Sequence, residues 1–131
     1  MRIRLLTLTT AAAIALAGCG GDDDDEPGRT ATVPASGTIE VVGDEYSFDP
    51  ENLVFDTGGT EKELKIVLRN EGSLAHNLRV FRDGEEIGGT PTFQGGESRE
   101  GTVTVRPGTY DLICTVGNHA DLGMTGKLEV R

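Results

Sequence analysis

The residues best suited to chemistry in this sequence have soft donor atoms, and most of them lie close together near the C-terminal end. Cys114, His119 and Met124 follow one another in the pattern C-x4-H-x4-M. The 131-residue chain has only two cysteines, two histidines and two methionines, and one methionine is the initiator. The second histidine, His76, lies well upstream. Each residue alone is a common core residue, but their concentration indicates a metal site.

The types of the donors distinguish between metals. A thiolate with two imidazoles suits copper, and a thioether as a weak additional ligand completes the donor set of a blue copper electron-transfer site. Zinc is the competing metal, but a structural zinc site has little use for a thioether. The donor set therefore predicts one copper ion per chain, bound by His76, Cys114, His119 and Met124.

The N-terminal residues have the features of an export signal. Two arginines precede an apolar stretch, residues 5–17, that is too short to span a bilayer. The sequence LAGC, residues 16–19, resembles a bacterial lipobox. We therefore expect residues 1–18 to be a lipoprotein signal peptide and Cys19 to be the lipidated N-terminus; an ordinary secretory signal is the alternative. Lipidation leaves Cys114 as a free thiol in an oxidising compartment, where a metal would explain it.

The segment after Cys19 differs in composition from the rest of the chain. Residues 19–37 contain an acidic run and no hydrophobic periodicity, which predicts a lipidated, acidic and flexible tether. The whole chain has a formal net charge of −10, and its 12 basic residues are scattered. Because phosphate binding needs clustered lysines and arginines, this charge pattern excludes nucleic acid as a partner.

Alternating apolar residues dominate the chain from Thr38 onward. Leu64, Ile66 and Leu68 share one face of a predicted strand, because successive side chains of a strand point to opposite faces. We expect strands at 38–43, 52–58, 63–72, 76–81 and 126–131, a glycine-rich hairpin over 82–96, and two strands within 99–115. This spacing predicts an all-β fold with little helix, a Greek-key β-sandwich of seven to eight strands over residues 38–131.

The motifs AHNL (75–78) and C-x4-H-x4-M, with YSFDP (46–50) and PGTYDLICT (107–115), resemble those of the cupredoxin family of blue (type 1) copper proteins, which includes plastocyanin, azurin and auracyanin. The resemblance implies that His76 and His119 bind copper through a ring nitrogen, Cys114 as a thiolate and Met124 axially. It also implies that Asn77 donates its backbone amide to the thiolate and braces Thr115 with its side chain.

One position departs from the family pattern. Relatives with this loop length often have Pro-Gly before the histidine, where this sequence has Gly117 and Asn118. We expect a less rigid loop as a result. In the family the edge of the loop histidine is exposed within a small apolar patch, which predicts a patch of four residues around His119: Leu74, Gly117, Ala120 and Leu122.

The resemblance implies an electron carrier. We expect a monomer, tethered to the cell membrane by its lipid anchor on the extracytoplasmic (periplasmic) side, that passes single electrons between redox partner proteins. The alternative is a copper-binding lipoprotein that scavenges copper or delivers it to an oxidase. An enzyme is not expected, because related oxidases need further copper centres and both histidines are already committed to one site.

Overall fold

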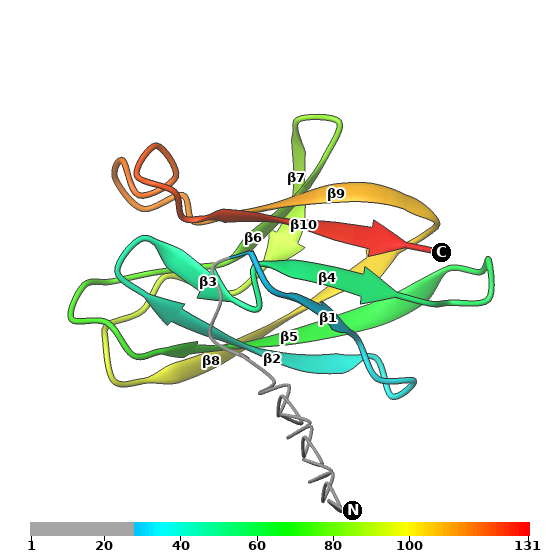
Figure 1. The fold of residues 1–131 in the computed structure, drawn as a ribbon, viewed down its shortest axis with the longest axis horizontal. Coiled ribbons are helices and arrows are strands. Elements are labelled where there is room, and N and C mark those ends of the chain that lie inside the picture. Colours follow the sequence, from blue (N-terminus) through cyan, green and yellow to red (C-terminus); the bar gives the residue numbers. More distant parts are fainter. Residues whose placement is uncertain (1–27) are drawn as a thin grey trace, which may run out of the picture.

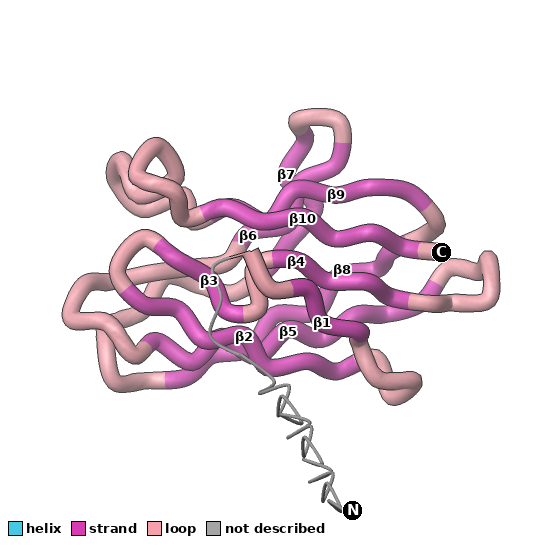
Figure 2. The backbone as a smooth tube through the Cα atoms, in the orientation of Figure 1, coloured by secondary structure: helices cyan, strands magenta, loops and turns pink. Residues whose placement is uncertain are grey.

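The computed structural model describes residues 28–131. The predicted signal peptide, the lipidation site Cys19 and the acidic run of the tether lie outside the described residues. The described part of the chain contains strands and loops but no helix (Figure 2), and so offers no helix that could cross a membrane.

Ten strands form two sheets within residues 28–131 (Figure 1). The six-stranded sheet has the order β1-β4-β10-β9-β6-β7, and the four-stranded sheet has the order β3-β2-β5-β8. The bounds are β1 Thr30–Thr32, β2 Thr38–Asp44, β3 Ser47–Asp49, β4 Asn52–Phe55, β5 Lys62–Asn70, β6 Arg79–Arg82, β7 Glu85–Gly89, β8 Ser98–Val105, β9 Gly108–Ile113 and β10 Thr125–Val130.

Alternation along the strands produces the core between the two sheets. Leu64, Ile66 and Leu68 of β5 are fully buried, as their shared face predicts. Leu112 of β9 and Leu128 of β10 are also fully buried, in the other sheet. Each such side chain stabilises the fold by about 1.5–3 kcal/mol relative to leaving it in water. The predicted all-β sandwich is therefore confirmed.

The structure has more strands than the seven or eight expected, and the domain begins earlier than residue 38. Thr30–Thr32, which we expected in the tether, pairs in parallel with β4. The following residue, Val33, is buried and donates its backbone N–H to the carbonyl oxygen of Val54 at 2.8 Å. A stretch this short carries too little alternation to be distinguished from a linker by pattern alone.

Four connections meet at one end of the sandwich, the left-hand end in Figure 1. They are the tight β2–β3 turn, the β5–β6 loop, the β7–β8 loop and the β9–β10 loop. The opposite end holds the β4–β5 connection and the C-terminus (Figure 1). Residues distant in sequence are therefore brought together at the first of these ends.

His76 does not lie on a regular strand, in contrast to the expected strand at 76–81. Strand β6 begins at Arg79, and His76 forms an isolated bridge with Phe93 instead. Each of the two residues donates its backbone N–H to the other's carbonyl oxygen at 3.1 Å. These two hydrogen bonds fix the backbone of His76 within the β5–β6 loop.

Candidate metal centre

Three of the four predicted ligands converge in the interior at the loop end of the sandwich. The Nδ1 atoms of His76 and His119 lie 3.2 Å apart. The Sγ atom of Cys114 lies 3.9 Å from Nδ1 of His76 and 3.7 Å from Nδ1 of His119. All three side chains are buried, and one donor atom of each lies within 4.8 Å of the others. A thiol and two imidazoles in this arrangement can hold one metal ion.

Met124, the predicted axial ligand, lies beside this cluster. Its backbone N–H donates to the carbonyl oxygen of His119 at 3.0 Å, and its carbonyl oxygen accepts from the N–H of Cys114 at 3.1 Å. The side chain is fully buried, and its Cε atom packs over Gly43 of β2, where an added Cβ would lie only 3.4 Å away. These two backbone hydrogen bonds therefore tie Met124 to both loop ligands, while its role as axial ligand stays a prediction.

The β9–β10 loop is held by its own backbone hydrogen bonds, although it lacks the proline common among relatives. The N–H of His119 donates to Val116 at 3.1 Å, and the N–H of Leu122 donates to His119 at 3.1 Å. Gly117 has a φ of +50°, which a proline cannot adopt because its ring holds φ near −65°. The loop thus has a backbone conformation at this position that a proline could not adopt, and its lower rigidity stays a prediction.

Asn77 joins the loop of the first histidine to the loop of the cysteine. Its Oδ1 accepts the backbone N–H of Thr115 at 2.8 Å, and its Nδ2 donates to Oγ1 of Thr115 at 2.8 Å. The same Nδ2 also donates to Oγ1 of Thr92 at 2.9 Å. The structure thus shows the side-chain brace between Asn77 and Thr115, whereas the hydrogen bond from the Asn77 amide to the thiolate stays a prediction.

The β2–β3 turn is part of the site, and sequence reasoning missed it. Oε1 of Glu45 lies 3.6 Å from Nε2 of His76. The ring of Tyr46 contacts the ring of His119 edge-on, with centroids 5.2 Å apart and planes at 69°. Tyr46 has a φ of +63°, a conformation that is rare for a bulky residue. Tyr46 begins the YSFDP motif of the family resemblance, but that motif does not reveal a contact with a distant histidine, and Glu45 lies outside it.

Electrostatics favour the form of His76 that can bind a metal. Burial lowers the pKa of His76, and the nearby His119 lowers it further, whereas the carboxylate of Glu45 opposes the shift. The N–H of Leu74 holds the pKa of Glu45 below its usual value. A neutral imidazole with a free lone pair is therefore the expected state of His76 at neutral pH, and this is the form that ligates copper.

One buried polar atom lies on the side of the His76 ring that faces away from the cluster. Within residues 28–131, Nε2 of His76 is the buried side-chain polar atom that has no hydrogen-bond partner. When Nδ1 of a histidine binds a metal, the ring proton resides on Nε2 and that N–H normally finds an acceptor. The donor set and the orientation of the His76 ring, with Nδ1 inward, both fit copper.

The outer surface of the centre is apolar, but His119 contributes less to it than expected. Its side chain is only 8% exposed, whereas Leu74 is 41% and Leu122 50% exposed. The ring of Tyr46 packs against the ring of His119, whose edge we expected to be exposed to solvent. Of the four predicted patch residues, Leu74, Gly117 and Leu122 are exposed and Ala120 is half-buried.

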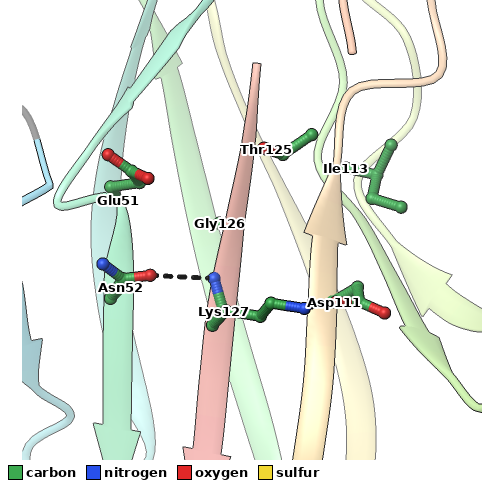
Figure 3. Close-up of a pocket in the computed structure, with 7 residues that line it drawn as sticks. All are labelled: Glu51, Asn52, Asp111, Ile113, Thr125, Gly126 and Lys127. Carbon is green, nitrogen blue, oxygen red and sulfur yellow. Dashed lines mark hydrogen bonds and ion pairs between the residues drawn. The ribbon is translucent and has the colours of Figure 1, made fainter. Parts of the chain in front are cut away.

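A second concave region lies away from the centre, over β4, β10 and β9 (Figure 3). It has a volume of about 270 Å³ and contains no cysteine or histidine. Its polar groups bind one another: Asn52 accepts the N–H of Lys127 at 3.1 Å, and the Lys127 side chain pairs with Asp111. It is lined by Glu51, Asn52, Asp111, Ile113, Thr125, Gly126 and Lys127. Nothing in this region suggests chemistry.

Comparisons with known proteins agree with this geometry. Residues 31–131 match the family described as copper binding proteins, plastocyanin/azurin family. Dithionite-reduced auracyanin from the photosynthetic bacterium Roseiflexus castenholzii is 24% identical, with a TM-score of 0.65, over 75% of this chain and 99% of the other. Auracyanin A, a blue copper protein of Chloroflexus aurantiacus, is 26% identical, with a TM-score of 0.59. The match covers 77% of this chain and 100% of auracyanin A. A search of curated proteins finds no match.

The brace between the two ligand loops yields a first prediction. Asn77→Ala removes three side-chain hydrogen bonds and leaves the N–H of Thr115 without its partner. We expect the free energy of unfolding to fall by about 2 kcal/mol, measured by urea denaturation. Copper affinity should fall at least about tenfold, measured by competitive titration.

A matched variant separates this effect from the mere loss of an asparagine. Asn118 lies exposed in the β9–β10 loop, so Asn118→Ala should change both quantities much less. Wild-type stability and wild-type copper affinity in Asn77→Ala would show that the brace does not hold the site.

Proposed function

Because the chain belongs to the plastocyanin/azurin family of copper-binding proteins, we propose that it is a type 1 copper electron carrier, held outside the cytoplasmic membrane by lipidated Cys19. The observation that supports the proposal most strongly is the convergence of the buried donors of His76, Cys114 and His119 within 4.8 Å of one another. This donor set is that of blue copper electron-transfer sites.

The residues of the site have distinct parts in such a function. His76, Cys114 and His119 would hold the metal, with Met124 as the fourth ligand. Bound copper supplies a one-electron couple between Cu(II) and Cu(I). The loop hydrogen bonds and the Asn77 brace keep the donors in place when the charge of the site changes. A site that needs little rearrangement suits rapid electron exchange.

The surface over the site suits brief encounters with partner proteins. Leu74 and Leu122 are exposed beside the buried donors and offer a small apolar contact. Weak redox complexes bury little area, so two exposed leucines and the neighbouring loops are a suitable size. The net charge of −10 favours partners with basic docking surfaces and predicts rates that fall as salt increases.

Copper delivery to an oxidase is the competing function, and the structure offers it less support. A protein that hands over its metal needs ligands that a partner can reach. Here His76 and Cys114 are fully buried and His119 is 8% exposed. An enzyme with further copper centres is not proposed, because both histidines of the sequence lie in this one cluster.

The proposal predicts a specific spectrum. Adding Cu(II) to the purified domain should produce an intense blue thiolate absorption and a narrow copper hyperfine pattern in EPR.

Cys114→Ser should abolish the blue absorption because it removes the thiolate. Met124→Leu should retain the colour and raise the reduction potential, since a weak donor to Cu(II) is lost. A pale, ordinary Cu(II) spectrum of the wild-type protein would contradict the proposal, and an unchanged potential in Met124→Leu would contradict the axial role.

The membrane anchor is tested separately. We expect the mature protein, isolated from membranes of cells that express the full chain, to begin at Cys19 and to carry the mass of the attached lipid in intact-protein mass spectrometry. Cys19→Ser should abolish lipidation and release the domain from the membrane fraction, because the tether itself has no apolar stretch. A mature wild-type protein without lipid would show that the anchor is absent.

A further inference from the structure

The His76 ring has two nitrogens in two different environments. Nδ1 faces the other donors, 3.2 Å from Nδ1 of His119 and 3.9 Å from Sγ of Cys114. Nε2 faces the β2–β3 turn, where Oε1 of Glu45 lies 3.6 Å away. The ring is fully buried, and Nε2 has no hydrogen-bond partner among the described residues. The carboxylate is thus placed on the side of the ring that is opposite the metal cluster.

We propose that Glu45 is a positioning residue for copper binding: its carboxylate accepts the Nε2–H of His76 and so holds the ring with Nδ1 toward the metal. The inference rests on copper binding, which family membership establishes, and on His76 being a ligand. It does not depend on the protein being an electron carrier. The present distance of 3.6 Å exceeds a hydrogen bond of about 2.7–3.2 Å, so a shift of less than about 1 Å closes it.

The carboxylate is held in this place by the β5–β6 loop. Oε1 of Glu45 accepts the backbone N–H of Ser73 at 2.7 Å and that of Leu74 at 3.0 Å. Gly72 leaves room for it, because an added Cβ there would lie only 2.2 Å from the same oxygen. The side chain of Glu45 is 33% exposed, and this one oxygen is directed at the loop that carries His76.

The same loop is also fixed from β5. Nδ2 of Asn70 donates to the carbonyl oxygen of Leu74 at 2.9 Å, and Oδ1 of Asn70 accepts the N–H of Gly72 at 3.0 Å. Because the loop backbone is anchored independently, Glu45 does not have to hold the loop alone. Its carboxylate can therefore be altered without unfolding the loop, which makes its effect on His76 measurable.

A carboxylate at this position has two consequences for the metal. A ring nitrogen that donates to a carboxylate leaves the other nitrogen a stronger donor, and it also fixes the tautomer. The negative charge favours the more positive ion. Both effects stabilise Cu(II) over Cu(I), so Glu45 raises the affinity for Cu(II) and lowers the reduction potential.

Four substitutions, two at Glu45 and two as controls, test the proposal on the full-length domain. Glu45→Gln keeps an oxygen for Ser73 and Leu74 but removes the charge. Glu45→Asp keeps the charge but withdraws it from His76 by one methylene. Asp44→Asn removes the neighbouring charge on the same turn, and asparagine retains an oxygen for the N–H that Asp44 accepts at 2.7 Å. Glu61→Gln, in the β4–β5 connection at the opposite end, controls for net charge.

We expect Glu45→Gln and Glu45→Asp to retain the blue absorption, to bind Cu(II) about tenfold more weakly and to have a higher reduction potential. Asp44→Asn and Glu61→Gln should each change the logarithm of the Cu(II) affinity by less than half of the change that the Glu45 variants cause. Competitive titration with Cu(II) and protein-film voltammetry measure the two quantities, and the thermal unfolding of each copper-free variant identifies a folding defect.

Two results would overturn the proposal. One is wild-type affinity and potential in both Glu45 variants. The other is an Asp44→Asn shift as large as that of Glu45→Gln, which would reduce the effect to general charge. If Glu45→Gln fails to fold, Glu45→Asp decides the question alone. A wild-type protein that forms a blue copper site but exchanges no electrons with redox partners would contradict the carrier function. It would not affect the test of Glu45, which measures copper affinity and reduction potential.

Discussion

Two imidazole nitrogens and one thiol sulfur share a small, buried space in this protein, and the rest of the structure depends on that constraint. Polar donor atoms without water are costly unless each has a partner. The protein brings His76, Cys114 and His119 together from two loops that are distant in sequence. Ten strands within residues 28–131 supply the frame, and four of their connections meet at the same end. Copper is the partner that the three donors can share.

The four connections fix the donors in different ways, and the β7–β8 loop does so through Phe93, which bonds the backbone of His76. The β9–β10 loop is folded on itself by backbone hydrogen bonds around His119. The β5–β6 loop is joined to it by Asn77, whose side chain bonds Thr115 twice. The β2–β3 turn contacts both histidines, through Glu45 on one and Tyr46 on the other. The site is therefore held by four connections, and a change in the β2–β3 turn or the β7–β8 loop acts on the copper ligands indirectly.

Much of this arrangement could be predicted from the sequence, because scarce residue types and alternating patterns are local signals. The ligand residues stood out by their rarity, and Leu64, Ile66 and Leu68 showed the buried face of β5. The alternation predicts the β-sandwich, and the resemblance of the AHNL and C-x4-H-x4-M motifs indicates the copper-binding family.

The remaining features depend on tertiary contacts, which one sequence does not reveal. Strand β1 exists because β4 offers it a partner. His76 leaves regular strand geometry because Phe93 bonds its backbone from a distant loop. The roles of Glu45 and Tyr46 depend on a turn reaching across the end of the sandwich, and the near-complete burial of His119 follows from the same contact.

The central claim is that the fold holds the copper ligands in place before the metal binds. Crystal structures of the purified domain with and without copper test this most directly. We predict that the metal lies between Nδ1 of His76, Sγ of Cys114 and Nδ1 of His119, and that these side chains differ by less than about 1 Å between the two structures. Ligand side chains that point apart in the copper-free crystal, or a copper ion bound without one of the three, would contradict the account.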